Sequence, residues 1–75
     1  MSRKASVHTV PNPKGKGWVN EVKGAVVSKH LRKDTAVARG RDLAKEAATE
    51  HNIHKLDGTI GTKNSYGNDP RNIKG

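Results

Sequence analysis

The sequence predicts a single α+β domain: a three-stranded antiparallel meander with one amphipathic helix packed on one face, then a short fourth strand and an ordered C-terminal turn (βββαβ). Three observations predict it. Short β-branched or alternating segments separated by turn residues fill the first 31 positions, and an alanine-rich stretch with helical periodicity follows. An Asp-Gly pair comes after the helix. A chain of 75 residues buries only about 60% of its unfolded surface, so the core must be small.

The three predicted strands lie in the N-terminal half. Residues 6–10 (SVHTV) form a β-branched run that the Pro-Asn-Pro sequence after it ends. A Lys-Gly-Lys-Gly loop leads to residues 18–23 (WVNEVK), which alternate in polarity as a half-buried strand does. Gly24 favours a tight turn into residues 25–31 (AVVSKHL). Short links between consecutive strands indicate an antiparallel meander.

The predicted helix begins at Asp34 or Thr35, either of which can cap it, and runs to Asn52, which fits a left-handed C-cap. Gly40 costs a free helix about 1 kcal/mol relative to alanine, so its presence in the apolar stripe indicates a close approach of helix to sheet. The stripe at 3.6 spacing comprises Ala36, Val37, Gly40, Leu43, Ala44, Ala47 and Ala48.

The segment after the helix, residues 53–60 (IHKLDGTI), contains the Asp-Gly turn signal and predicts a short strand or a small hairpin. Turn-forming residues 67–70 favour an ordered turn, with Tyr66 as a lid over the open end of the core. We expect the structural core and lid to include Trp18, Gly40, Leu43 and Tyr66.

One domain over residues 6–70 follows, with residues 1–5 a disordered basic start and residues 71–75 a loose end. The chain has no cysteine, so disulfides and thiolate metal sites are excluded. No apolar run is long enough for a signal peptide or a membrane helix. We expect a cytoplasmic protein.

The net charge of +8 is concentrated in the first half of the chain. Residues 1–33 carry eight Lys or Arg against Glu21 alone, whereas residues 34–55 are balanced. A localised basic field attracts polyanions such as nucleic acid, an acidic membrane or an acidic protein. Improved solubility is the alternative explanation for such a charge.

The residues capable of metal binding or catalysis form no complete set. His51 and His54 are three apart, but that spacing straddles the predicted helix end and the other two histidines come from separate strands. His54 with Asp57 and the hydroxyls of Thr59 or Ser65 lacks the elbow and oxyanion loop of a nucleophilic site. We therefore expect no metal, no cofactor and no enzymatic activity.

Four segments together resemble a known family: GKGWVNEVKG, TAVARGRDLAKEAA, IHKLDGTI and above all SYGNDP. Over roughly residues 6–75 the chain resembles the small bacterial and phage proteins catalogued as domain of unknown function 2188. The resemblance implies a compact α+β fold and a cytoplasmic setting. It implies no activity and no catalytic residues.

The function that these observations favour is non-enzymatic binding to the backbone of duplex DNA, in an accessory role associated with a phage or another mobile element. Low aromatic content argues against a single-strand stacking platform. The alternative is a protein-interaction module or inhibitor, acting on an acidic partner or as a homodimer, through an edge strand at SVHTV or around Ile53. The predicted DNA-binding residues are Lys14, Lys16, Lys23, Lys29, Arg32, Lys33, Arg39 and Arg41.

Overall fold

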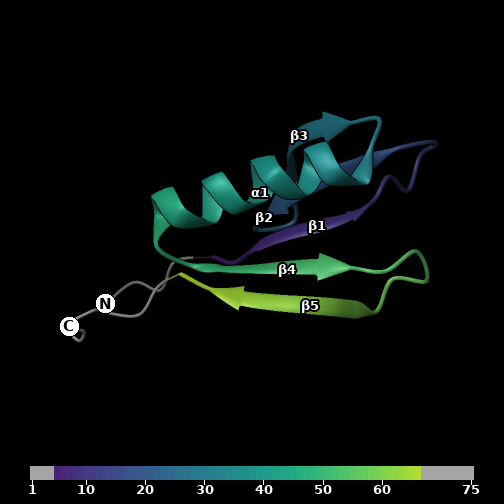
Figure 1. Cartoon of the computed structure of the whole chain (residues 1–75). Helices are drawn as coiled ribbons and strands as arrows, with labels where there is room; N and C mark the ends of the chain where they lie inside the picture. Colours follow the sequence, from purple (N-terminus) through teal and green to yellow (C-terminus); the bar gives the residue numbers. More distant parts are fainter. Residues whose placement is uncertain (1–4, 67–75) are drawn as a thin grey trace.

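The structure, a computed structural model, describes residues 5–66 and consists of one helix lying across one face of a twisted sheet (Figure 1). Its elements in chain order are β1 (Val7–Pro11), β2 (Trp18–Val22), β3 (Ala25–His30), α1 (Lys33–Ala47), β4 (Glu50–His54) and β5 (Ile60–Ser65). The α+β class and the order of three strands followed by a helix agree with the prediction.

The strands form one five-stranded mixed sheet in the order β3-β2-β1-β4-β5. β1, β2 and β3 make the predicted antiparallel meander. After α1 the chain enters β4 parallel to β1, and β5 returns antiparallel to β4. Because β1, β3 and β4 run in the same direction, three connections share one end of the molecule: residues 12–17, 31–32 and 55–59. We call this the loop end; it lies on the right of Figure 1.

The region after the helix differs from the predicted single short strand, because it forms a complete hairpin. Of the two alternatives for residues 53–60 the hairpin is the one found, but these residues mainly form its turn and its strands extend outward to Glu50 and Ser65. Asp57 organises the turn: its Oδ1 accepts hydrogen bonds from the Thr59 amide at 3.0 Å and the Thr59 hydroxyl at 2.7 Å. These bonds lower the pKa of the Asp57 carboxyl.

The helix starts near the predicted position and ends earlier. Arg32 occupies the N-cap position, and the side chains of Asp34 and Thr35 bond within the first turn instead of capping it from outside. Ala48 provides the left-handed C-cap, with φ of 53°. The prediction that Asn52 caps the helix is therefore wrong, since Asn52 lies inside β4. Ala48 is a poor residue for this conformation, which explains why the sequence did not reveal the helix end.

The core is small, as the length requires. Its buried apolar side chains are Val7, Trp18, Val19, Ala36 and Ala44. Three members of the predicted stripe, Ala36, Gly40 and Ala44, are buried against the sheet. Val37, Leu43 and Ala47 are half-buried, and Ala48 is exposed.

Tyr66, the predicted lid, is half-buried where β5 ends. Its amide donates to the Thr49 carbonyl at 3.1 Å, and the ammonium of Lys45 lies 5.7 Å from the centre of its ring. The ring is therefore placed beside the last turn of α1. The predicted turn at residues 67–70, and nearly all of the predicted disordered start and loose end, lie outside the described residues.

Candidate functional site

The connection between β1 and β2 is an ordered loop at the loop end. The Asn12 amide donates to the Gly17 carbonyl at 3.0 Å, and the Asn12 side chain accepts from the Lys14 amide at 3.0 Å. Gly17, with φ of 93°, touches the end of β3: a Cβ there would lie 2.4 Å from the His30 carbonyl oxygen. The loop is thus held against the end of β3 while Lys14 and Lys16 remain exposed.

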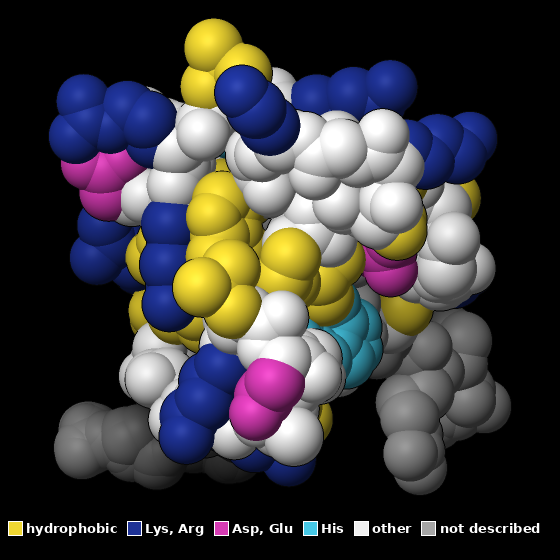
Figure 2. Space-filling model, turned by 90° about the vertical axis from the view of Figure 1, so that its right-hand side faces the viewer, with side chains coloured by type: hydrophobic (Ala, Val, Ile, Leu, Met, Phe, Trp, Pro, Cys, Tyr) yellow, Lys and Arg dark blue, Asp and Glu magenta, His cyan; other side chains and the backbone are white. Residues whose placement is uncertain are grey.

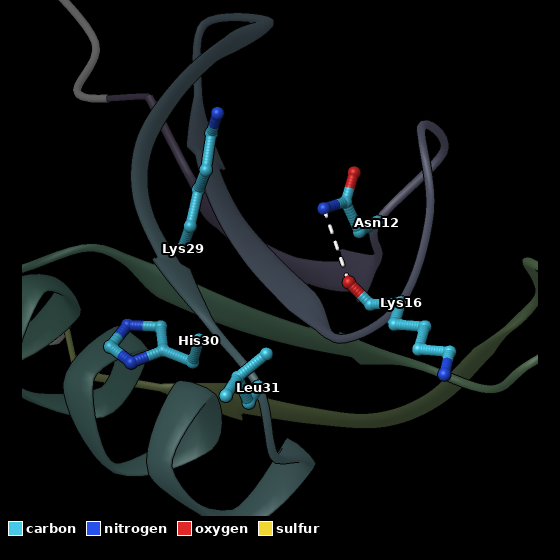
Figure 3. Close-up of a pocket in the computed structure, with 5 residues that line it drawn as sticks. All are labelled: Asn12, Lys16, Lys29, His30 and Leu31. Atoms are coloured by element: carbon cyan, nitrogen blue, oxygen red, sulfur yellow. Dashed lines mark hydrogen bonds between the residues drawn. The ribbon is translucent and has the colours of Figure 1, made fainter.

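A surface pocket of about 230 Å³ lies between this loop and β3. Its lining comprises Asn12, Lys16, Lys29, His30 and Leu31 (Figure 3). The side chains of Lys16 and Lys29 extend outward from opposite sides of the pocket, with Asn12 between them. The pocket therefore places one cation of the β1–β2 loop and one of β3 on one surface.

Two further cations follow directly in the sequence. Arg32 lies after Leu31 and forms an exposed ion pair of 3.0 Å with Asp34. Lys33 begins α1, and its ammonium lies 5.0 Å from the centre of the Trp18 ring. We call Lys14, Lys16, Lys29, Arg32 and Lys33 the loop-end basic surface. Figure 2 views this end of the molecule and shows Lys and Arg side chains around a central group of hydrophobic ones.

The other three predicted DNA-binding residues lie apart from this surface. Lys23 is in the tight turn between β2 and β3, at the opposite end of the sheet. Arg39 and Arg41 are exposed on α1. Lys29 points away from the helix, but Glu21 lies on the same helix-free face. The sheet face is therefore less basic than the loop end, and the cations converge on the loops.

Asn20 ties the helix to the strands beneath the loop-end basic surface. Its side-chain amide donates to the Ala36 carbonyl at 2.9 Å and to the Ser28 hydroxyl at 3.0 Å. Ser28 also contacts His30 Nε2 at 3.1 Å. These bonds fix β3, which carries Lys29, relative to the first turns of α1, which carry Lys33.

The same network continues into the centre of the sheet, under Gly40. The Thr9 hydroxyl donates to Asn20 Oδ1 at 2.5 Å and lies 2.6 Å from His51 Nε2. Because that hydroxyl has one proton, which goes to Asn20, His51 must donate from Nε2 and leave Nδ1 unprotonated. His51 is fully buried, and its Nδ1 has no hydrogen-bond partner among the described residues.

This environment favours the neutral form of His51. Burial lowers the pKa of His51, and the positive charges of Arg41 and His8 lower it further. A second proton would place a charge and an unpaired N–H in the core. The buried imidazole thus serves the fold and lies out of reach of any substrate.

The pH dependence of stability should follow from this histidine. As pH falls through about 6.5, His51 of the unfolded chain binds a proton, whereas His51 of the folded chain binds one only at lower pH. Acid therefore favours unfolding. The pKa of His8 is also lowered, mainly by burial, and adds in the same direction. We expect the free energy of unfolding in urea to fall between pH 7.5 and 5.5, and to fall less in His51→Gln. Equal stability of the wild-type protein at both pH values would contradict this assignment.

The two histidines that the sequence offered as metal ligands, His51 and His54, are not brought together. His51 faces the helix, whereas His54, three residues on in the same strand, faces away from it. Within residues 5–66 there is no group of three or more His, Asp or Glu side chains arranged to hold a metal ion. Asp57 and Thr59 are bonded to each other within a turn.

The sequence did not identify the polar cluster or the pocket. Thr9, Asn20 and His51 are buried at 0% exposure although each is polar. The one signal in the sequence was Gly40. The close approach of helix to sheet that it predicted is the contact of Gly40 with this polar cluster. Leu31, at 85% exposure, was expected to belong to a strand and instead lies on the surface among the cations.

The free edges of the sheet also differ from expectation. SVHTV was proposed as an edge strand, but β1 pairs with β2 on one side and β4 on the other. The segment around Ile53 is likewise paired on both sides. Both expectations are therefore wrong, because the parallel β1–β4 pairing places these strands in the interior. The edges are β3 and β5.

Comparison with known proteins gives one family and no individual relative. No curated protein and no solved structure matches the chain. In the part of the chain that the structure describes, no helix has the length and apolarity needed to cross a membrane. A family model matches residues 7–66, which span every strand and the helix and stop before most of the SYGNDP string. The chain therefore belongs to the family described as "Uncharacterized protein conserved in bacteria (DUF2188)".

Proposed function

We propose that this protein is a non-enzymatic binder of duplex nucleic acid that holds the phosphate backbone through the loop-end basic surface. The observation that carries the proposal is the convergence of five exposed cations from the β1–β2 loop, β3 and the start of α1 on one end of the molecule. Cations so grouped can neutralise successive phosphates and release their counterions.

The scaffold suits this role because it is rigid where the cations are attached. The loop is closed by hydrogen bonds of Asn12, and β3 is fixed to α1 through Asn20. The loop therefore presents Lys14 and Lys16 beside Lys29. Exposed Leu31 lies among them and offers apolar contact to the sugars.

The placement of Trp18 favours duplex over single-stranded nucleic acid as the ligand. Trp18 is 9% exposed and has Lys33 over its ring, so it is not free to stack on a base. Binding through phosphates alone would show little sequence preference. An accessory role on phage or other mobile-element DNA, in the cytoplasm, fits such a protein.

A pair of charge-neutralised variants tests the surface. Lys16→Gln/Lys29→Gln removes two cations of the loop-end basic surface, whereas Lys45→Gln/Lys63→Gln removes two cations elsewhere. In fluorescence anisotropy with a labelled duplex, the first variant should reduce the salt slope of log K by about 2, since each phosphate contact contributes about 0.9. The second should bind like the wild-type protein. Equal slopes for the two variants would contradict the proposed surface.

Protein pairing through β3 is a second candidate, favoured by Val26 and Val27. These side chains are 44% and 51% exposed on a strand whose outer edge is unpaired in the sheet. An edge of this kind can add a strand from a second copy of the chain. Sedimentation at increasing concentration distinguishes the two, because a dimer through β3 needs no nucleic acid.

A further inference from the structure

His8 and His54 form a close pair on the helix-free face of the sheet, distinct from the loop-end basic surface. His8 lies in β1 and His54 ends β4, and these neighbouring parallel strands lie side by side in Figure 1. His8 Nδ1 is 3.0 Å from His54 Nε2, and the ring centres are 5.3 Å apart. Both side chains are half-buried, so solvent reaches them.

The hydrogen bonds of the pair define which ring nitrogens hold protons. His54 Nδ1 lies 2.9 Å from the Gly58 carbonyl oxygen, which can only accept, so Nδ1 is protonated. Neutral His54 therefore presents an unprotonated Nε2 toward His8. A histidine oriented by donating its other ring N–H to a backbone carbonyl is the arrangement that metal-ligating histidines adopt.

We propose that His8 and His54 together bind a divalent transition-metal ion of the zinc or copper class through His8 Nδ1 and His54 Nε2. Imidazole nitrogens suit these ions. With metal–nitrogen bonds of about 2.0–2.1 Å, two nitrogens 3.0 Å apart subtend an angle of about 90–100° at the metal, which suits neighbouring coordination positions. His8 must turn its ring and move its proton from Nδ1 to Nε2, an exchange that solvent mediates.

Two neighbouring side chains can support such a site without ligating the metal. Glu21 is the cross-strand partner of His8 and supplies negative charge next to it. Asn52 pairs with His8 on the other side, and its buried Oδ1 has no hydrogen-bond partner among the described residues. Two protein nitrogens leave the remaining coordination positions to water.

Zinc titration followed by calorimetry tests the site with the full chain. We expect one Zn²⁺ per chain at pH 7.5, with affinity reduced by about a hundredfold in His8→Gln and in His54→Gln, because each removes half of a chelate. His30→Gln is the matched control and should bind zinc as the wild-type protein does. No binding by the wild-type protein, or undiminished binding in either pair variant, would overturn the proposal.

A measurement on the unmutated protein guards against variants that fail to fold. In nitrogen-15 spectra of the imidazoles, zinc should shift His8 Nδ1 and His54 Nε2 and leave buried His51 in place. Shifts confined to other histidines would also overturn the proposal. Because these histidines are not part of the loop-end basic surface, failure of this experiment leaves the DNA-binding proposal intact.

Discussion

Replacing Gly40 with alanine is expected to destabilise the protein by about 2–4 kcal/mol, the reverse of what alanine does in a free helix. In an exposed helix the change would add about 1 kcal/mol of stability. Here the new Cβ would lie 2.5 Å from His51 Nε2, 2.6 Å from Asn20 Oδ1 and 2.7 Å from Thr9 Oγ1. Overpacking costs typically 1–3 kcal/mol, and displaced buried hydrogen bonds add to that.

Thermal unfolding followed by circular dichroism measures the Gly40→Ala effect. In a domain of this size the expected loss lowers Tm by about 10–25 °C. Gly61→Ala is the matched control, because the nearest atom there is the flexible side chain of Lys55 at 3.1 Å. It should change stability by no more than about 0.5 kcal/mol. A Gly40→Ala protein as stable as the wild type would show that the helix does not rest on the polar cluster.

Replacing Asn20 with leucine, a residue of similar size, is expected to cost about 2–4 kcal/mol. The change leaves the Thr9 hydroxyl, the Ser28 hydroxyl and the Ala36 carbonyl without their bonds to Asn20. Leaving buried polar atoms short of a hydrogen bond costs about 1–3 kcal/mol per group, although leucine regains part of this by apolar burial, and Thr9 and Ser28 keep their contacts to His51 and His30. Urea unfolding of the variant measures the loss.

A double variant separates this explanation from a simple packing defect. The Thr9→Val/Asn20→Leu variant also removes the Thr9 hydroxyl, which donates to Asn20 Oδ1 in the wild-type protein. No hydroxyl is then left unpaired at position 9, so the double variant should lose less free energy of unfolding than the two single variants lose together. If the loss in the double variant equalled the sum of the two single losses, Thr9 and Asn20 would contribute to stability independently of each other.

The sequence predicted those parts of the fold that local patterns specify. The meander followed from three short segments with turn residues between them, and the apolar stripe of α1 was read correctly at Ala36, Gly40 and Ala44. The glycine at position 40 even indicated the close contact of helix and sheet. What it did not indicate was that the contacting groups are polar.

The parts that were missed depend on long-range pairing. Whether β4 joins the sheet at an edge or beside β1 is determined by the crossover of α1, for which no short sequence pattern exists. That single choice turned β1 into an interior strand and moved the free edges to β3 and β5. It also brought His51 against Thr9 and His54 next to His8, two contacts between residues more than 40 positions apart.

The candidate DNA-binding residues were predictable as a set but not as a surface. Charge counting identified the eight cations, and the structure places five of them at the loop end. Lys23 was expected to share one basic surface with Lys29, Arg32 and Lys33, yet the β2–β3 turn lies at the opposite end of the sheet. Strand direction, not sequence distance, decides which cations lie at the same end of the sheet.

The central claim, that the loop-end basic surface binds the phosphate backbone, is tested most directly by wild-type binding to a labelled duplex as salt rises from about 50 to about 200 mM. Contacts by Lys14, Lys16, Lys29, Arg32 and Lys33 predict a log–log slope of about −4 to −5. Affinity should therefore fall several-hundredfold over this range. No binding at the lower salt, or binding that salt leaves unchanged, would contradict the claim.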